Sequence, residues 1–190
     1  MARAGLDKNS VISRAAKLAN EEGLESITLK RLADDLGIQT PSLYNHISGL
    51  EDLRKQLMIY GWKQMEEKII QAVIGVSGYD ALRAIGYAFY DYATENPGVF
   101  SAMLWYNKFQ DEETMGATEG LFTIIYKITK SLNISEENSE HLIRTWRGFL
   151  EGFALLVNNG AFGHPISIKD SFEKSLDVLV EGSRSLEERT

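Results

Sequence analysis

Apolar residues recur through most of this 190-residue chain at the three- and four-residue spacing of one helix face. Glycine, proline and asparagine separate the periodic stretches, as at Asn96-Pro97-Gly98, and no segment is rich in strand-forming residues for long. The pattern predicts an all-α fold of about nine helices. Their expected ranges are 9–22, 28–36, 40–47, 50 into the seventies, 79–95, 99–109, 111–132, 135–158 and 168–186.

The segment 28–47 is predicted to form two short helices joined by a tight turn. Thr28 stands where a side-chain oxygen caps the first helix, and Gly37 stands where the left-handed conformation ends it. The second helix opens at Thr40 with Pro41 just inside, where a missing N–H costs nothing. Apolar residues line the inner faces of both helices: Leu29, Leu32, Ala33, Leu36, Ile38, Leu43 and Ile47. These features are typical of a helix-turn-helix.

The outer face of the second helix contains no charged residue. It presents compact hydrogen-bonding groups on Gln39, Thr40, Ser42, Tyr44, Asn45 and His46. Such groups bind base edges and phosphates, whereas an ordinary solvated helix carries lysine and glutamate. Two short helices around a glycine also occur in many all-α proteins without a DNA-binding role. The uncharged face favours a DNA-binding helix over that alternative.

The charge of the chain is acidic, with a net charge of −7 and a pI near 5.1. Residues 1–54 hold seven Lys and Arg against eight Asp and Glu, so most of the acidic excess lies in residues 55–190. A nearly neutral DNA-binding part must rely on a few positioned cations and on helix N-termini facing phosphates. The candidate cations are Arg3, Lys8, Lys30 and Arg31. We therefore expect modest affinity per subunit and a need for dimerisation.

Several classes of protein are excluded by composition. The chain has no cysteine, no apolar run long enough for a membrane span and no signal-peptide pattern, which predicts a soluble cytoplasmic protein without a membrane partner. Glu137 and His141 lie one helical turn apart, but no third metal ligand is evident. No nucleophile, phosphate-loop or dinucleotide motif occurs. We expect no enzyme activity, no metal and no cofactor.

The order of these elements resembles the TetR family of bacterial transcriptional repressors. The resemblance covers about residues 8–60 and rests on Thr28, Leu32, Ala33, Leu36, Gly37, Leu43, Tyr44, His46 and Leu53. ENPGVF at 95–100 and WRGFLEGFALL at 146–156 are similar to a C-terminal subgroup named for a Trp-His-Gly motif, with Arg147 in place of the histidine. The resemblance implies a three-helix DNA-binding domain at 1–54, with its helix-turn-helix at 28–47, and an effector-binding and dimerisation domain at 55–190.

The resemblance also implies a DNA-binding site. Tyr44 and His46 are expected to contact phosphates, while the other polar residues of the second helix face bases. The full expected site is Thr28, Lys30, Arg31, Gln39, Thr40, Pro41, Ser42, Tyr44, Asn45 and His46. Many family members carry a phosphate-binding lysine at the start of the next helix, where this chain has Leu50. That phosphate contact is expected to be absent.

Two further sites are expected in the C-terminal part. Aromatic and large apolar residues suit an effector pocket, with plain core packing as the alternative: Phe89, Tyr90, Phe100, Met103, Leu104, Phe109, Phe122, Tyr126, Trp146, Phe149 and Phe153. Gly148 and Gly152 lie four residues apart and allow close approach of another helix, from the same chain or from a second copy. The resemblance implies that the last two helices, at about 136–158 and 168–186, pair with their copies as a four-helix bundle. The expected dimer interface is Gly148, Gly152, Leu155, Phe172, Leu176 and Leu179.

These observations predict a homodimeric transcriptional regulator, most simply a repressor. It binds a palindromic double-stranded operator, and a small-molecule effector bound to the C-terminal domain changes the spacing of its DNA-binding helices. Two alternatives remain: a helical ligand- or partner-binding protein with a weakened DNA-binding part, and an all-α enzyme with an aromatic cavity.

Overall fold

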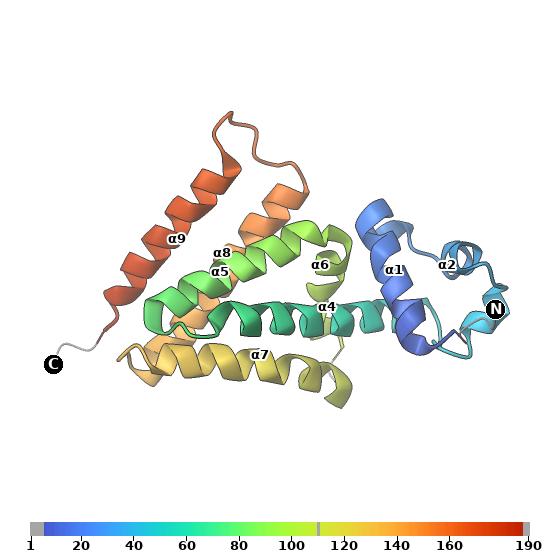
Figure 1. Cartoon of the computed structure of the whole chain (residues 1–190), viewed down its shortest axis with the longest axis horizontal. Helices are drawn as coiled ribbons and strands as arrows, with labels where there is room; N and C mark the ends of the chain where they lie inside the picture. Colours follow the sequence, from blue (N-terminus) through green and yellow to red (C-terminus); the bar gives the residue numbers. More distant parts are fainter. Residues whose placement is uncertain (1–5, 110, 188–190) are drawn as a thin grey trace. The chain divides into compact units, whose positions relative to one another are not determined.

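The structure, a computed structural model, describes residues 6–109 and 111–187 (Figure 1). The described part contains nine α-helices, two short 3-10 helices and no strand, apart from one isolated bridge between Ile134 and Glu187. The elements are α1 (Lys8–Glu22), η1 (Leu24–Ser26), α2 (Leu29–Leu36), α3 (Thr40–Leu43), α4 (Leu50–Val73), α5 (Gly78–Glu95), α6 (Pro97–Met103), η2 (Tyr106–Lys108), α7 (Glu112–Lys130), α8 (Glu136–Asn158) and α9 (Ile168–Arg184). The predicted all-α fold is confirmed. Across the described residues, no helix is long and apolar enough to cross a membrane.

The chain packs into two compact units whose boundaries fall inside helices. The first unit combines Met1–Gln64 with Asn96–Ala117, and the second combines Met65–Glu95 with Thr118–Thr190. Helices α4 and α7 each begin in the first unit and end in the second. This packing division differs from the functional division at residue 54, which stays a prediction. The segment α1–α3 is called the head below.

Local capping explains where the helices of the head begin and end. The Asp7 carboxylate accepts a hydrogen bond from the Ser10 amide at 2.7 Å and caps α1. The Thr28 hydroxyl accepts one from the Arg31 amide at 3.0 Å and caps α2, as predicted. Gly37 ends α2 with φ of 65°, in the left-handed region that glycine enters without strain.

Two helices, α3 and α6, end well before their predicted ends. Helix α3 ends at Leu43, and the Tyr44 amide bonds the Pro41 carbonyl three residues back at 3.3 Å, so residues 44–46 form turns. The predicted helix 99–109 ends at Met103, which corrects that range. The Trp105 ring lies between two cations, 5.0 Å from the Arg54 guanidinium carbon and 4.2 Å from Lys108 Nζ. The α-helical hydrogen-bond pattern of α6 ends at this place, because the Trp105 amide donates to a carbonyl only three residues back.

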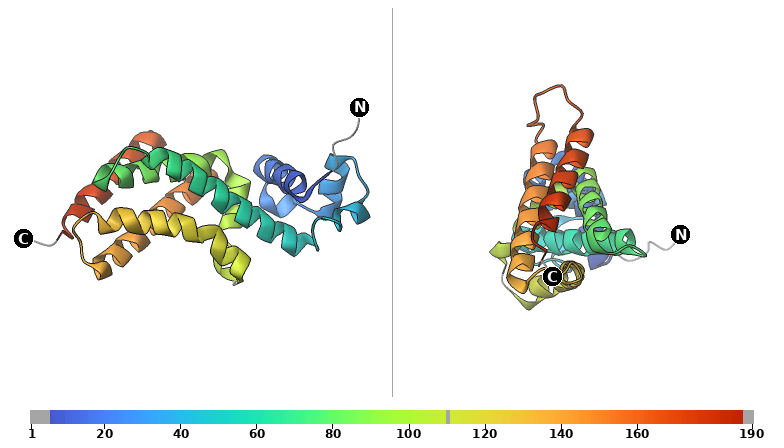
Figure 2. Two further views of the ribbon diagram at one scale, coloured as in Figure 1. Left: turned by 60° about the horizontal axis from the view of Figure 1, so that its bottom comes forward. Right: turned by 90° about the vertical axis from the view of Figure 1, so that its left-hand side faces the viewer.

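The core of the second unit is formed by α5, α8 and α9, which pack on one another. The right-hand view of Figure 2 shows α8 and α9 side by side, joined by the loop at residues 159–167. Gly86 allows α5 to approach α9 closely, because a Cβ there would lie 2.7 Å from the Leu176 side chain. The buried Trp146 indole donates to the Ser183 hydroxyl at 3.1 Å and joins α8 to α9. Helices α5, α8 and α9 therefore form a packed layer, and the buried N–H of Trp146 has a hydrogen-bond acceptor within it.

Candidate nucleic-acid interface

The turn after α3 is anchored by buried apolar side chains. Leu43 is 0% exposed and Ile47 is 2% exposed, so both ends of the turn are fixed in the core of the head. Leu32 and Ala33 bury the facing side of α2. These four residues carry out the inward roles that the sequence predicted. The backbone from residue 40 to 47 is therefore held firmly while its outer side stays open.

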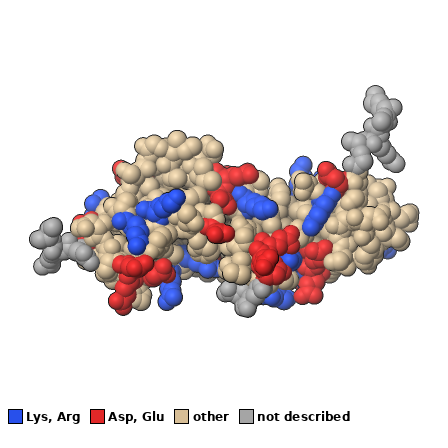
Figure 3. All heavy atoms as spheres, turned by 90° about the horizontal axis from the view of Figure 1, so that it is seen from below, with Lys and Arg blue, Asp and Glu red and all other residues tan. Residues whose placement is uncertain are grey.

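The outer side of this turn is polar and accessible. Tyr44 is 58% exposed, and Gln39, Pro41, Ser42 and Asn45 are exposed as well, while Thr40 and His46 are half-buried. We call these seven residues the reading face. The part of Figure 3 that corresponds to this end of the head in Figure 1 shows mostly uncharged surface. The structure thus gathers the predicted base- and phosphate-binding side chains on one uncharged face.

The predicted cations of the head behave differently from one another. Lys30 is exposed and forms no ion pair with any described residue. Arg31 donates through Nε to the Glu22 carboxylate at 3.1 Å, and its Nη1 lies 3.6 Å from Asp35 Oδ1. The hydrogen bond to Glu22 raises the pKa of Arg31 above its ordinary value. Arg31 is thus occupied inside the head, whereas Lys30 remains available to a phosphate.

The remaining candidate cations of the head offer few further phosphate ligands among the described residues. Lys8 opens α1 and is exposed. Arg3 lies outside the described residues. Arg14 donates through Nη2 to Asp35 at 2.7 Å, which ties α1 to α2 and lowers the pKa of the Asp35 carboxyl. The arginines of the head therefore hold its helices together, so attraction of DNA depends on lysines and on helix N-termini.

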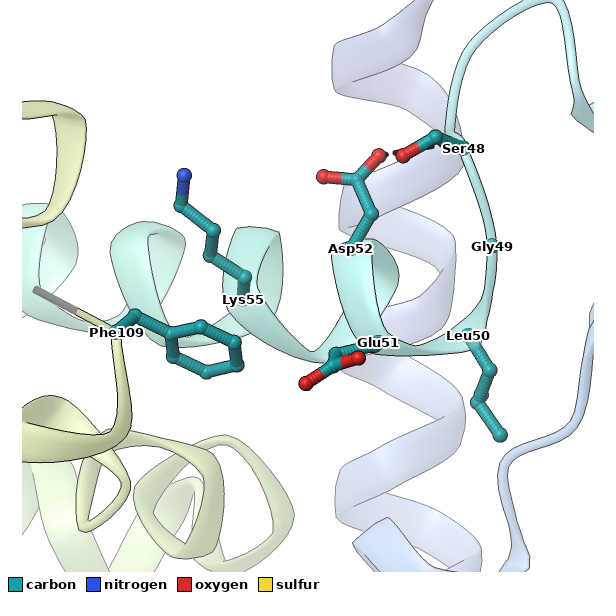
Figure 4. A pocket seen from close by; sticks show the side chains of 7 residues that line it. All are labelled: Ser48, Gly49, Leu50, Glu51, Asp52, Lys55 and Phe109. Carbon is teal, nitrogen blue, oxygen red and sulfur yellow. Dashed lines mark hydrogen bonds between the residues drawn. The ribbon is translucent and has the colours of Figure 1, made fainter. Parts of the chain in front are cut away.

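An open groove lies at the start of α4 (Figure 4). Leu50 opens the helix, and the Asp52 carboxylate accepts a hydrogen bond from the Ser48 amide at 2.7 Å. Glu51 adds a second carboxylate, and Lys55 is the one cation among the described residues that line the groove. The Asp52 carboxylate thus already accepts the hydrogen bond of the Ser48 amide, which is the donor that a bound anion would need. This arrangement supports leaving Leu50 out of the DNA-binding site.

Lys55 is itself neutralised by the beginning of α7. Its Nζ lies 2.6 Å from Asp111 Oδ2 and 2.9 Å from Glu113 Oε2. Gln56 also donates to Glu113 at 3.2 Å. The hydrogen bond from Lys55, followed by one from the Thr114 amide, lowers the pKa of Asp111 from 3.8 to about 2. This ion-pair cluster fastens the start of α7 to α4 within the first unit.

The lowered pKa of Asp111 predicts an acid-sensitive contribution to stability. The folded chain keeps this carboxylate charged at a pH where the unfolded chain binds a proton, so the contribution is present above pH 3.8 and is lost as the pH falls towards about 2. Asp111→Asn should therefore flatten the fall in free energy of unfolding over that interval, measured by urea titration. Asp34→Asn, which removes an exposed carboxylate without a described ion pair, should leave the slope unchanged. Equal slopes for both variants would contradict the assignment.

The residues predicted for an effector pocket divide between the two units. Four lie in the first unit: Phe100, Met103, Leu104 and Phe109. Seven lie in the second: Phe89, Tyr90, Phe122, Tyr126, Trp146, Phe149 and Phe153. Phe100, Met103 and Trp146 are buried core residues, whereas Leu104 is exposed. Each unit therefore holds a part of the predicted set.

Several aromatic rings form a cluster on α5, α8 and α9 and the loop between α8 and α9. Phe172 lies at its centre, stacked on Tyr90 with ring centroids 4.1 Å apart and on Phe149 at 5.8 Å. Phe153 lies 5.2 Å from Phe172 and 4.9 Å from Phe162. The sequence prediction missed Phe162 and placed Phe172 in the dimer interface. Phe162 follows the glycine break after α8, where helical periodicity no longer indicates which side chains turn inward.

The predicted dimer residues also separate into two groups. A Cβ at Gly148 or Gly152 would meet nothing within 4 Å, and Leu155 is exposed and Leu179 half-buried on the same pair of helices. Phe172 and Leu176 are 1% and 0% exposed inside the chain, so they belong to its core and offer no surface to a second copy. The apolar surface also includes Leu156 and Val178, which the sequence prediction missed. An open groove between α8 and α9 is lined by Phe149, Lys174, Ser175, Val178 and Leu179.

The one candidate metal pair stays a two-residue contact. Glu137 Oε1 and His141 Nε2 lie 3.9 Å apart on exposed side chains. Within residues 6–109 and 111–187, no group of three or more possible ligands comes together. The geometry therefore offers a contact between two exposed side chains and no chelating set among the described residues.

Comparison with known proteins gives matches over the whole chain. Residues 82–179 match the family described as Tetracyclin repressor-like, C-terminal domain. The uncharacterised HTH-type transcriptional regulator YobS of Bacillus subtilis is 29% identical over 95% of this chain and 94% of its own length. An uncharacterised HTH-type transcriptional regulator of Mycobacterium tuberculosis is 30% identical over 83% of this chain and 72% of its own length.

A solved structure shares the fold. It is a variant of TetR from Acinetobacter baumannii AYE in complex with minocycline. The match has a TM-score of 0.73 and 19% sequence identity, and it covers 97% of this chain and 100% of the other. At this identity the likeness is one of fold, and it agrees with an N-terminal helix-turn-helix followed by a helical C-terminal part.

Proposed function

Since the chain belongs to the TetR family of transcriptional regulators, we propose that it is a homodimeric repressor that binds a palindromic operator and answers to a small molecule. Members of this family are DNA-binding proteins without enzyme activity, so the predicted absence of catalysis is confirmed. The Trp-His-Gly subgroup stays a prediction. Operator DNA lies in the cytoplasm of a bacterium, which is the compartment that the proposal implies.

The observation that carries the proposal is the reading face. Gln39, Ser42 and Asn45 are exposed amides and hydroxyls, of the kind that bind base edges in the major groove. Tyr44 and His46 flank them and can donate to phosphates. Thr40 and Pro41 begin the helix that carries these side chains. Because Leu43 and Ile47 fix the backbone, these side chains meet DNA in one register.

The dimer is proposed on α8 and α9. A palindrome requires two reading faces about one DNA turn, roughly 34 Å, apart, and two-fold symmetry supplies that arrangement. Gly148 and Gly152 leave open space on α8, and Leu155, Leu156 and Val178 add exposed apolar area beside them. Exposed large apolar side chains gathered on two neighbouring helices suit an interaction surface. A second copy of the chain, packed on α8 and α9, would remove these apolar side chains from water.

The effector is proposed to bind among the aromatic residues of α5, α8 and α9. The cluster around Phe172 offers ring faces and edges, and Tyr90 adds a hydroxyl. Such a lining suits a largely apolar or aromatic molecule with few polar groups. The fold relative from Acinetobacter baumannii was solved in complex with minocycline, a small molecule. Ligand binding then shifts the population towards a spacing of heads that no longer fits the operator.

Lys30 is predicted to supply a phosphate contact that Arg31 does not. Lys30→Ala should weaken operator binding and reduce the slope of log K against log salt by about 0.9 per subunit, because one phosphate is no longer neutralised. Arg31→Ala breaks the pair with Glu22 and should lower the thermal stability of the head while changing this slope less. Binding titrations at several salt concentrations measure both slopes. Equal slope changes for the two variants would show that Arg31 leaves Glu22 to bind DNA.

The proposal is tested by selecting bound sequences from random double-stranded DNA with the full-length protein. Enrichment of a palindrome, with two chains bound per duplex by light scattering, is the expected result. A selection that enriches no sequence would overturn it. That outcome would favour the alternative of a helical ligand- or partner-binding protein with a weakened head. A reporter gene under the selected palindrome then measures whether bound protein lowers transcription.

A further inference from the structure

Helix α6 is capped by a side chain from the head. The Asn20 Oδ1 atom on α1 accepts hydrogen bonds from the Gly98 and Val99 amides, both at 3.0 Å. Its Nδ2 donates to the Asn96 side chain at 2.9 Å. These residues are 76 to 79 positions apart in the sequence. One asparagine thus satisfies the first free amides of α6 and fixes them to α1.

Two glycines bring α6 against its neighbours. A Cβ on Gly98 would lie 1.9 Å from the Ala19 carbonyl oxygen, so the backbones of α6 and α1 touch. A Cβ on Gly61 would lie 2.6 Å from the Met103 side chain, so side chains of α6 pack against the bare backbone of α4 at this position. Val99 and Met103 are buried by this packing. Helix α6 is therefore held between α1 and α4, as Figures 1 and 2 show within the first unit.

This packing determines how the head is tethered to the rest of the chain. The chain crosses between the two compact units at three places, at 64–65, 95–96 and 117–118. Two of these crossings bound the segment that contains α6. While Asn20 holds α6 on α1, the head is joined to the rest of the first unit through α6 as well as through α4. If α6 came away, the head would be connected through α4 alone, and its orientation would be less restricted.

We propose that Asn20 is a positioning residue that sets the spacing between operator half-sites. The inference rests on the proposed function, because spacing has meaning only for a dimer on a palindrome. Asn20 lies on α1, outside the reading face, so the bases preferred within each half-site stay the same when it is changed. The number of base pairs between the half-sites depends on how firmly each head is held. The contact of Asn20 with α6 supplies that restraint.

The test compares operator spacing for full-length variants in the random-DNA selection. The wild-type protein should favour one spacing over spacings one base pair shorter or longer by about tenfold, the range that a helix cap contributes. Asn20→Ala should reduce this preference to about twofold while retaining the same half-site bases. A wild-type spacing preference in Asn20→Ala would overturn the inference.

Two controls separate positioning from loss of stability. Asn20→Asp keeps an acceptor for the Gly98 and Val99 amides, and a carboxylate suits a helix N-terminus, so it should retain the single spacing. Asp35→Asn breaks the pair with Arg14 in the same head without touching α6, and it should also retain one spacing. Broadened spacing in all three variants would reflect general destabilisation and overturn the role of Asn20.

A measurement on the wild-type protein keeps the inference testable if Asn20→Ala fails to fold. Hydrogen exchange of the Gly98 and Val99 amides should be as slow as that of the buried amides of α1, because both belong to one body. Fast exchange at these two amides beside a protected α1 would overturn the inference. If the wild-type selection enriches no palindrome, the proposed function fails and the spacing role fails with it. If the wild-type protein selects a palindrome and Asn20→Ala prefers the same spacing, only the spacing role of Asn20 is contradicted.

Discussion

Tyr44→Ala is expected to reduce operator affinity by about a hundredfold or more, because each subunit loses a contact worth about 1–3 kcal/mol and the dimer loses two. The side chain is largely exposed, so its removal should leave the melting temperature and the dimer unchanged. Fluorescence anisotropy with the selected duplex measures the affinity, and circular dichroism measures the fold. The combination of lost binding and retained stability is specific to a residue that contacts DNA.

Two further variants identify what Tyr44 contributes. Tyr44→Phe removes only the hydroxyl, so it should lose the phosphate hydrogen bond and retain the ring contacts, with an intermediate affinity. Met115→Ala removes another exposed side chain of the first unit, away from the reading face, and should bind as the wild type does. Undiminished binding by Tyr44→Ala would contradict the assignment of the reading face.

Gly98→Ala is expected to cause the largest loss of stability. The added methyl would lie 1.9 Å from the Ala19 carbonyl oxygen and 2.1 Å from its carbon, and backbone atoms cannot move aside as a flexible side chain can. Overpacking of this kind should lower the free energy of unfolding by about 3 kcal/mol or more, which corresponds to roughly 10 °C in melting temperature for a chain of this size. Differential scanning calorimetry measures both quantities.

Gly116→Ala is the matched control for this substitution. It makes the same chemical change in the same unit, at a helical position where a Cβ meets nothing within 4 Å. Alanine is the better helix former, so this variant should be more stable than the wild type by up to about 1 kcal/mol. A similar loss of stability in both variants would show that the approach of α6 to α1 is not what Gly98 permits.

The parts of the fold that the sequence predicted well are those fixed by neighbouring residues. Thr28 caps α2 through an amide three residues on, and Gly37 ends the same helix through its own backbone conformation. The anchors Leu43 and Ile47 follow from helical spacing within one short segment. Such features need no knowledge of the rest of the chain. The reading face could be predicted for the same reason, as the side opposite these anchors.

The parts that the sequence did not predict depend on distant segments. Asn96-Pro97-Gly98 reads as a chain break, and the proline does mark the start of α6. The role of Gly98 becomes visible only once Ala19 lies against it. Phe172 was assigned to a dimer surface because the resemblance implies that the last helix dimerises, but it is 1% exposed and stacks on Tyr90 in the core. Helical periodicity identifies an apolar face, and it does not identify which neighbour covers that face.

Which charged side chains are free to bind DNA could not be predicted from the sequence either. Lys30 and Arg31 are adjacent and looked equivalent as phosphate ligands. In the folded chain Glu22, nine residues before Arg31, occupies its guanidinium, while Lys30 stays unpaired among the described residues. The near-neutral charge of the head thus has a structural reason, because its arginines join helices. Its DNA binding depends correspondingly more on the uncharged reading face.

The most direct test of this account is hydrogen exchange of the full-length protein with and without the selected duplex. The account predicts that DNA slows exchange at the first amides of α2, residues 29–31, and across residues 39–46, where the reading face lies. Protection confined to other helices, or no protection of residues 39–46 at a concentration that saturates binding, would contradict it.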